Sequence, residues 1–235
     1  MHKQTGLGLR CSGNIPPAVL QRLPRYLAQV QILCARGVTW VSSAELADKL
    51  SLTSSTVRHD LRHVEFSGIS KRGYETAGLR AALERMLGAD VSWNVAVVGA
   101  GNLGRALALH EEFVRRGFII SALFDSDKKK IGRRFGQLKV RGMDQLPQTI
   151  VQNKIDIGVI AVPASAAQRV ADLLIASGIR GLLNLSSTHI IAPRQVPVVD
   201  ARIVASLQEL AHLIRIRGRE GSARRSAPST GGAMS

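Results

Sequence analysis

The feature that most constrains the fold of this chain is the segment Val95–Gly104, which reads VAVVGAGNLG. A continuous run of Val and Ala is typical of a strand buried on both faces of a parallel sheet. Gly99 suits a tight turn, Gly101 lets the backbone approach a pyrophosphate, and Gly104 allows close packing of a helix on the strand. The segment therefore predicts a strand, a phosphate-binding turn and a helix with the phosphates at its N-terminus.

An acidic residue follows where a dinucleotide site needs one. A second apolar run, IISALF, ends at Phe124, and Asp125 comes 21 residues after Gly104. At that distance a carboxylate accepts hydrogen bonds from the ribose hydroxyls of the adenosine half. We therefore expect a Rossmann-like domain with NAD(H) as its cofactor, contacted by Gly99, Ala100, Gly101, Asn102, Leu103, Gly104 and Asp125.

Further cofactor contacts are expected at the same edge of the sheet, because ligands of open α/β sheets bind at the carboxyl ends of the strands. Val162 and Pro163 follow a buried strand and offer apolar surface to a ribose or nicotinamide. Asn184 ends the next strand, where its amide either bonds the cofactor or only orders a loop. Lys130 closes a run of three lysines that either neutralises a phosphate or forms a solvated face. Asp125 itself favours NAD over NADP, since a carboxylate repels a 2′-phosphate.

The chain divides into three structured regions between two polar ends. Residues 1–14 are expected to be a disordered leader, and residues 15–88 a helical domain that carries much of the basic charge. Residues 89–200 alternate strand and helix patterns, as parallel βαβ units do. Residues 201–217 predict a last helix, with an apolar side, and residues 218–235 a disordered basic tail. The predicted strands are 95–98, 119–124, 139–140, 157–161 and 181–184, and the predicted helices between them are 103–116, 143–152 and 166–177.

Val41–Leu61 predicts two short helices joined by a turn. Ser43 is expected to cap the first helix, and Thr53 or Ser54 the second. This is the helix-turn-helix pattern, whose second helix enters the major groove of DNA, although an ordinary helical hairpin has the same pattern. The nearby KRGY segment is typical of a wing that brings cations to the minor groove. The predicted DNA contacts are Ser43, Ser54, Ser55, Arg58, His59, Lys71, Arg72 and Tyr74.

Composition favours nucleic acid as the partner. The formal net charge of +15 attracts polyanions, DNA first and an anionic membrane surface second. The two cysteines lack metal-ligand spacing, argue against a disulfide scaffold and suit the reducing cytoplasm, where we expect the protein to work. An apolar run of about 18 residues and a signal-peptide core are both absent, so no membrane contact is expected. We also expect no metal: His59 and His63 lie four residues apart, but no third ligand is evident.

These motifs resemble the Rex family of redox-sensing transcriptional repressors. The resemblance covers most of residues 15–213, in the segments IPPAVLQRLPRYL, the helix-turn-helix, GAGNLG, FDSDKKKIG, AVPASAAQRVAD, GIRGLLN and LQELA. It implies an α/β protein with an N-terminal winged helix-turn-helix domain, a Rossmann-like parallel-sheet domain and a C-terminal helix exchanged between the subunits of a homodimer. It also implies binding to double-stranded operator DNA when NADH is scarce relative to NAD, and release when NADH binds.

The chain departs from the family at residues that the resemblance links to redox coupling. His110 stands where the family usually has a tyrosine, and Arg202 where it usually has an aspartate; the resemblance implies that these positions form a network with Arg22. Arginine in place of aspartate reverses the local charge. Asp200, two residues earlier, could substitute if the backbone shifts, but the two-residue offset points its side chain elsewhere. The pair Lys71–Arg72 also stands two positions later than the family's basic pair. We therefore expect altered discrimination between NADH and NAD, with DNA and dinucleotide still bound.

Two other classes of function share these motifs. A small NAD-dependent oxidoreductase with a fused basic module would have the same glycine turn, and so would a structural protein that binds CoA or a nucleotide. A dehydrogenase, however, needs a substrate pocket with an acid/base group and an anion clamp, normally on a further domain. Only one helix and a tail follow the Rossmann region in this sequence, so we expect a protein that is not an enzyme.

Overall fold

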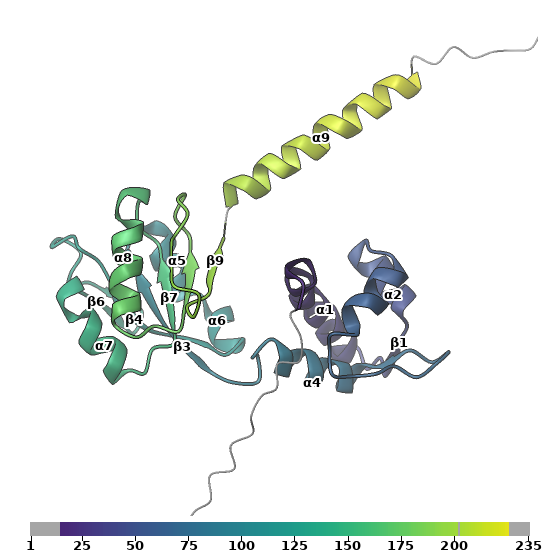
Figure 1. The fold of residues 1–235 in the computed structure, drawn as a ribbon, viewed down its shortest axis with the longest axis horizontal. Coiled ribbons are helices and arrows are strands. Elements are labelled where there is room, and N and C mark those ends of the chain that lie inside the picture. Colours follow the sequence, from purple (N-terminus) through teal and green to yellow (C-terminus); the bar gives the residue numbers. More distant parts are fainter. Residues whose placement is uncertain (1–14, 202, 226–235) are drawn as a thin grey trace, which may run out of the picture. The chain divides into compact units, whose positions relative to one another are not determined.

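The chain divides between Val91 and Ser92 into two units (Figure 1). Each unit has its own hydrophobic core. The computed structural model describes residues 15–201 and 203–225. The described part of the first unit has four helices and a two-stranded antiparallel sheet, in the order α1 (Pro17–Ala35), β1 (Trp40–Val41), α2 (Ser43–Leu50), α3 (Ser54–Leu61), β2 (Tyr74–Glu75) and α4 (Thr76–Met86).

The core of the first unit is built on one face of α1. Leu23, Tyr26 and Val30 recur at the three- and four-residue spacing of a helix and have no exposed surface. They belong to one buried cluster with side chains from α2, α3 and α4, such as Leu46 and Leu79. Burial of each such leucine stabilises the fold by about 1.5–3 kcal/mol. This core fixes α2 and α3 relative to α1.

The second unit is built on a seven-stranded sheet with the strand order β5-β6-β4-β3-β7-β8-β9. Neighbouring strands are parallel except for the antiparallel hairpin formed by β5 and β6. The strands are β3 (Trp93–Val98), β4 (Phe118–Phe124), β5 (Arg134–Phe135), β6 (Leu138–Arg141), β7 (Ile157–Ile160), β8 (Gly181–Asn184) and β9 (Val198–Asp200); the helices are α5 (Asn102–Leu109), α6 (Glu111–Arg115), α7 (Leu146–Gln152), α8 (Ala164–Ala176) and α9 (Ile203–Arg225).

Alternating residues of β3 face opposite sides of the sheet. Ala96 and Val98 share a cluster with side chains of α7 and α8, whereas Val95 and Val97 share a second cluster with Leu107 of α5. Helices therefore cover both faces of a mostly parallel sheet. The predicted fold class, α/β with a Rossmann-like domain after a helix-turn-helix domain, is confirmed.

The helix predicted over residues 103–116 is wrong in one respect, because it is broken at His110. This residue has an extended backbone (φ −84°, ψ 107°), and its Nδ1 accepts a hydrogen bond from the Glu112 N–H at 3.2 Å. His110 thus ends α5 and caps α6 at once. The helix predicted from residue 143 likewise begins with a 3-10 turn, Met143–Gln145, before α7.

Two strands of the second unit were absent from the prediction because they are short. β5 has two residues and β9 has three, and β9 follows a segment that contains Pro193 and Pro197. Proline is unfavourable inside strands, so that segment does not predict one. Their positions at the two edges of the sheet come from pairing with β6 and β8, which a local pattern does not contain.

The last helix is longer than predicted. It continues to Arg225, whereas residues from 218 onward were expected to lie in a tail. Residues 218–225 contain Gly218 and Gly221, which weaken a helix but do not block it, and no proline; the next proline is Pro228. Three predictions fall on residues that lie outside the described ones. The leader was assigned to residues 1–14, part of the redox network to Arg202 and part of the tail to residues 226–235.

Candidate DNA interface and dinucleotide pocket

Capping side chains define both helices of the helix-turn-helix. The cap of α2 is Ser42, one residue earlier than predicted: its hydroxyl accepts the Glu45 N–H, and the Glu45 carboxylate accepts the Ser42 N–H. This reciprocal pair satisfies two N–H groups that a helix end otherwise leaves free. Thr53, one of the two predicted candidates, caps α3, and Ser51 makes the turn between the helices in the left-handed region at φ 55°.

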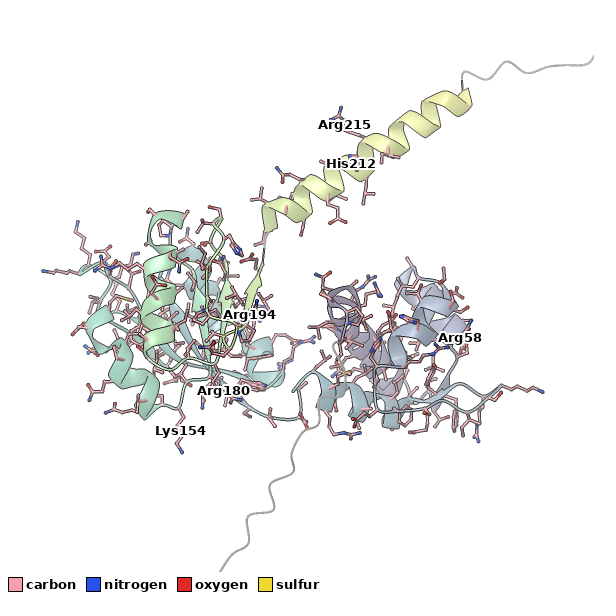
Figure 2. All side chains as sticks on the ribbon, viewed as in Figure 1. Arg58, Lys154, Arg180, Arg194, His212 and Arg215 are labelled. Atoms are coloured by element: carbon pink, nitrogen blue, oxygen red, sulfur yellow. The ribbon has the colours of Figure 1, made fainter. Side chains whose placement is uncertain are left out.

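The outer face of α3 carries side chains suited to DNA. Ser55, Arg58 and His59 are exposed, whereas Ser54 is half-buried. The Arg58 guanidinium lies 3.3 Å from the Ser43 hydroxyl of α2, and Figure 2 shows its side chain among those of the first unit. Hydroxyl and guanidinium groups at the start and middle of a second helix match the contacts that such helices make with phosphates and base edges.

An ion pair between the half-buried Arg22 and the buried Asp60 fixes α3 against α1. Arg22 of α1 donates two hydrogen bonds to the Asp60 carboxylate, at 2.6 and 2.7 Å, and the Tyr26 hydroxyl donates a third at 2.7 Å. Burial would raise the pKa of the Asp60 carboxyl, but the hydrogen bonds from Arg22 and Tyr26 outweigh it and hold that pKa below its usual value. Burial and the bond to Asp60 raise the pKa of Tyr26.

Asp60 and Tyr26 were missed by the sequence analysis, although a signal was present. Asp60 lies between Val57 and Leu61 at helical spacing, and all three are buried. A carboxylate on the apolar face of a helix needs a buried partner, since an unpaired charge there is costly. Arg22, which the family resemblance placed in a redox network, is that partner here.

The predicted wing is a tight turn with an antiparallel bridge between Ile69 and Gly73. Lys71 and Arg72 are exposed, and the Arg72 guanidinium lies 3.9 Å from the centre of the Trp40 ring. This cation–π contact holds Arg72 in place. Tyr74, also predicted to contact DNA, is half-buried and packs against the core of the first unit.

The glycines of the Rossmann turn are explained by close contacts. Gly99 has φ 109°, and a Cβ on it would overlap the Ala161 carbonyl. A Cβ on Gly104 would overlap the Gly99 carbonyl, whereas one on Gly101 would meet open space. Gly99 and Gly104 therefore allow the turn and the helix to pack, and Gly101 leaves room for a ligand beside the N-terminus of α5, where N–H groups favour phosphates.

The Asp125 carboxylate closes the other side of the turn. Its oxygens accept the Ala100 N–H and the Asp127 N–H, each at 2.8 Å, and the Lys130 ammonium at 2.9 Å. Burial acts to raise the pKa of Asp125, but the N–H groups and the ammonium outweigh it, so the pKa is lowered and the group stays ionised. Asp125 is thus an anion with its charge compensated by Lys130.

A cavity of about 670 Å³ opens at the carboxyl ends of β3, β4 and β7. Its lining includes Gly99, Gly101, Asp125 and Lys130, on the side of the turn. The rest is mainly apolar and includes the predicted Val162 and Pro163, together with side chains that the sequence analysis missed: Met143, Ala166, Arg169, Val170 and Leu173. A concave, mostly apolar site with a few polar groups is typical of nucleotide binding.

Several predicted residues lie outside the lining of this cavity. Ala100 and Gly104 are buried, whereas Asn102 and Leu103 are exposed at the start of α5. The Asn184 amide donates to the Thr188 carbonyl and to Asp200, and its oxygen accepts from the N–H and hydroxyl of Ser186. With these bonds its capacity is filled. The structure therefore favours the alternative that Asn184 orders its loop.

The remaining candidate residues are the histidines at positions 59, 63 and 110. The His110 ring contacts Phe113 edge-to-face, with the centroids 5.5 Å apart. His59 and His63 have centroids 5.8 Å apart, and within the described ranges no three His, Cys, Asp or Glu side chains converge as a metal site would require. No described helix is long and apolar enough to cross a bilayer.

Comparison with known proteins covers both units. A family model described as a CoA binding domain matches residues 90–188, and one described as a putative DNA-binding protein N-terminus matches residues 14–61. The redox-sensing transcriptional repressor Rex of Caldicellulosiruptor bescii is 38% identical over 199 residues, which are 85% of this chain and 92% of that protein. Rex of Carboxydothermus hydrogenoformans is 38% identical over 202 residues, 86% of this chain and 97% of that protein.

Solved structures of a Rex-family repressor are also similar to this chain. The Rex-family repressor RSP in complex with β-NAD+ and operator DNA has a TM-score of 0.82 and 29% identity, and covers 92% of this chain and 100% of its own. RSP in complex with β-NADH has a TM-score of 0.81 and 30% identity, and covers 90% of this chain and 99% of its own.

Proposed function

Because this chain belongs to the Rex family of redox-sensing transcriptional repressors, we propose that it binds a palindromic operator as a homodimer and that bound NAD(H) sets its affinity for this DNA. The observation that carries the proposal is one chain with both an exposed, capped second helix of a helix-turn-helix and a dinucleotide pocket. The alternative of an oxidoreductase is not supported, since the relatives are repressors and not enzymes.

The first unit reads the operator. Two copies of α3 enter successive major grooves, as the symmetry of helix-turn-helix dimers demands. Ser55, Arg58 and His59 contact phosphates and base edges, while Lys71 and Arg72 of the wing contact the backbone. The Asp60 ion pair supports the contacts by fixing the angle of α3 on α1.

The second unit holds the dinucleotide. The N–H groups beside Gly101 bind the pyrophosphate, and the Asp125 carboxylate accepts hydrogen bonds from the ribose hydroxyls of the adenosine half. The cavity beside Asp125 also contains Val162 and Pro163, so these two residues contact the adenosine half of the cofactor in this proposal and not the nicotinamide considered from the sequence. Lys130 supports ribose binding by Asp125, because its ammonium donates a hydrogen bond to that carboxylate and, with the N–H groups, keeps it ionised and in place.

The homodimer forms through α9. Its described side chains are exposed, and seven of them are large and apolar: Ile203, Val204, Leu207, Leu210, Leu213, Ile214 and Ile216. Such a face needs a partner to be stable in water. Exchange of this helix between two subunits would cover it.

We further propose that the protein acts in the cytoplasm, where a bacterial-type operator is reached.

Discrimination between NADH and NAD is altered in this chain. Arg202 brings a positive charge where the family resemblance implies an aspartate, and the Arg22 guanidinium already pairs with Asp60. His110, in place of a tyrosine, is used as a helix cap. A differential affinity of about 1–3 kcal/mol between the two dimer arrangements still suffices for regulation.

The test is a titration of NADH and NAD against a complex of the full-length protein with an operator fragment at one salt concentration. Arg58→Ala should weaken operator binding by about 1–3 kcal/mol, while Lys49→Ala on α2 serves as the control. Saturable NADH binding without affinity for any promoter fragment would refute the repressor. Strong release by NADH with no effect of NAD would refute the altered discrimination.

A further inference from the structure

The greatest density of positive charge in this chain lies away from the helix-turn-helix. Residues 43–61 contain two lysine or arginine residues and three acidic ones. Residues 15–88, expected to carry much of the basic charge, supply only ten of the 32 Lys and Arg residues. Residues 128–141, in contrast, contain seven and no acidic residue, against a net charge of +15 for the whole chain. We call residues 128–141 the basic hairpin segment.

Most of these cations face solvent. Lys128, Lys129, Arg133, Arg134 and Lys139 are all exposed, and they form no ion pair with any residue that the structure describes. The other two have partners: Lys130 pairs with Asp125, and Arg141 donates to the Thr149 hydroxyl. Five exposed cations therefore lie on the turn before β5 and on the β5–β6 hairpin, and two of them, Arg134 and Lys139, are paired in register.

The register of the hairpin places two of them directly opposite each other. Arg134 of β5 pairs with Lys139 of β6, and Phe135 pairs with Leu138. Opposite residues of an antiparallel pair share a face, so Phe135 and Leu138 lie on the reverse side of the hairpin. On that side Phe135 packs against the core, and its ring centre lies 5.3 Å from the Arg105 guanidinium. Like charges directly opposite destabilise a sheet. The hairpin thus has an anchored apolar side and a repulsive cationic side.

This repulsion needs an explanation other than protection of a sheet edge. Edge strands often carry lysine to prevent pairing with other chains. A strand of two residues, such as β5, is already too short to serve as a template for pairing, and most of the cations lie outside it. A bound anion, in contrast, removes the repulsion and makes use of the whole cluster.

We propose that the exposed face of the basic hairpin segment binds phosphates of duplex DNA, as a sequence-independent contact additional to that of the helix-turn-helix. The proposal rests on the function proposed above. Phosphate contacts provide much of the affinity of DNA-binding proteins, through release of counterions. Residues 43–61 of the helix-turn-helix contain only two lysine or arginine residues, whereas the basic hairpin segment has five exposed ones.

The test uses the full-length protein with the substitutions Arg133→Gln, Arg134→Gln and Lys139→Gln together. A matched control carries Arg115→Gln, Lys154→Gln and Arg194→Gln, which remove the same charge from other positions of the same unit; Lys154 and Arg194 are labelled in Figure 2. Binding to a non-operator duplex is measured at several salt concentrations. The melting shift produced by NADH reports whether the pocket stays intact in each protein.

The hairpin variant should bind the duplex about tenfold more weakly at low salt, and the slope of log K against log salt should fall by about 0.9 for each phosphate that the variant no longer neutralises. The control should keep most of the wild-type slope. Equally weakened binding in the two variants, or unchanged binding in both, overturns the proposal. Weaker binding to phosphatidylserine vesicles with unchanged DNA binding also overturns it, in favour of a membrane surface.

Failure of this proposal is distinct from failure of the repressor function. If the wild-type protein binds the operator and the hairpin variant matches the control, only the hairpin contact is refuted. If the wild-type protein binds no duplex at all, the repressor function itself is refuted. In an Arg58→Ala background, the hairpin substitutions should weaken DNA binding further, because the two contacts are separate.

Discussion

Each unit of this protein holds a shielded aspartate beside a cation, and the two pairs differ in what surrounds them. Asp60 is fully buried, and its bonds run to Arg22 and Tyr26 of another helix. Asp125 is almost as well shielded and is bonded to Lys130, but it lines a cavity. The first pair joins two helices, whereas the second faces a site where a ligand can reach it.

The comparison shows that charge state alone does not identify a functional carboxylate. In both groups burial raises the pKa and hydrogen bonds lower it, and the hydrogen bonds prevail. Both are therefore ionised at neutral pH. Only the cavity beside Asp125 distinguishes a binding group from one that holds the fold together. Substitution of each aspartate, and the pH dependence of stability, test this distinction.

The largest effect is expected from Asp60→Ala. Removal of one partner from a buried ion pair typically costs about 3–5 kcal/mol, and because the Arg22 side chain is 26% exposed and reaches water, we expect about 3 kcal/mol here. The first unit should lose this much stability in urea unfolding. Trp40 lies in the first unit and Trp93 in the second, so fluorescence of single-tryptophan variants separates the two transitions.

The control for Asp60 is Asp48→Ala, at an exposed position of α2. It should change stability by no more than about 0.5 kcal/mol. An equal effect of the two substitutions would contradict the structural role of Asp60. NADH affinity should be unchanged in both proteins, since neither residue lines the cavity.

The second-largest effect is expected from Asp125→Asn, on the affinity for NADH. Hydrogen bonds to charged groups contribute about 1.5–3 kcal/mol each, so NADH affinity should fall by roughly tenfold or more. The measurement is NADH fluorescence titration, with Asp144→Asn, exposed after β6, as the control. Should Asp125→Asn bind NADH as tightly as the wild type, the distinction between the two aspartates would fail.

The smallest effect is the pH dependence of stability. A carboxyl group whose pKa is lower in the folded than in the unfolded state stabilises the fold above its unfolded pKa, and this contribution is lost as pH falls through the folded pKa. Both units should therefore lose stability as pH falls below 3.8, the ordinary value for aspartate.

In the first unit this dependence should be much weaker in Asp60→Asn, because the titrating group is gone. Urea midpoints from Trp40 fluorescence across this pH range give the measurement. A variant that retains the full wild-type dependence would show that other carboxyl groups cause it. The second unit of the same variant, followed by Trp93, serves as the internal control.

Sequence spacing predicted the two binding motifs because their chemistry is local. The glycines at 99, 101 and 104 are separated by one turn of chain, and the second helix of the helix-turn-helix begins at a capping threonine. The cap of the first helix was misplaced by one residue, since Ser42 and Ser43 are chemically alike and only the contact with Glu45 decides between them.

The break at His110 was not predictable from hydrophobic spacing. Residues 103–116 continue a helical pattern across it, and histidine is not a helix breaker. The bond from the Glu112 N–H to the imidazole competes with the helical backbone, and the spacing of apolar residues does not contain that bond. Asn184 gives the same lesson: its position suited a ligand, and its neighbours in space use its amide instead.

The sequence by itself determined the order of the two units, the glycine turn and the identity of the side chains on α3, because each depends on residues a few positions apart. Only the tertiary structure decided which charges are paired. Asp60 meets an arginine 38 positions away, and Arg134 lies opposite Lys139 through strand register. Electrostatic energy depends on distance and burial in space, and the linear pattern contains neither.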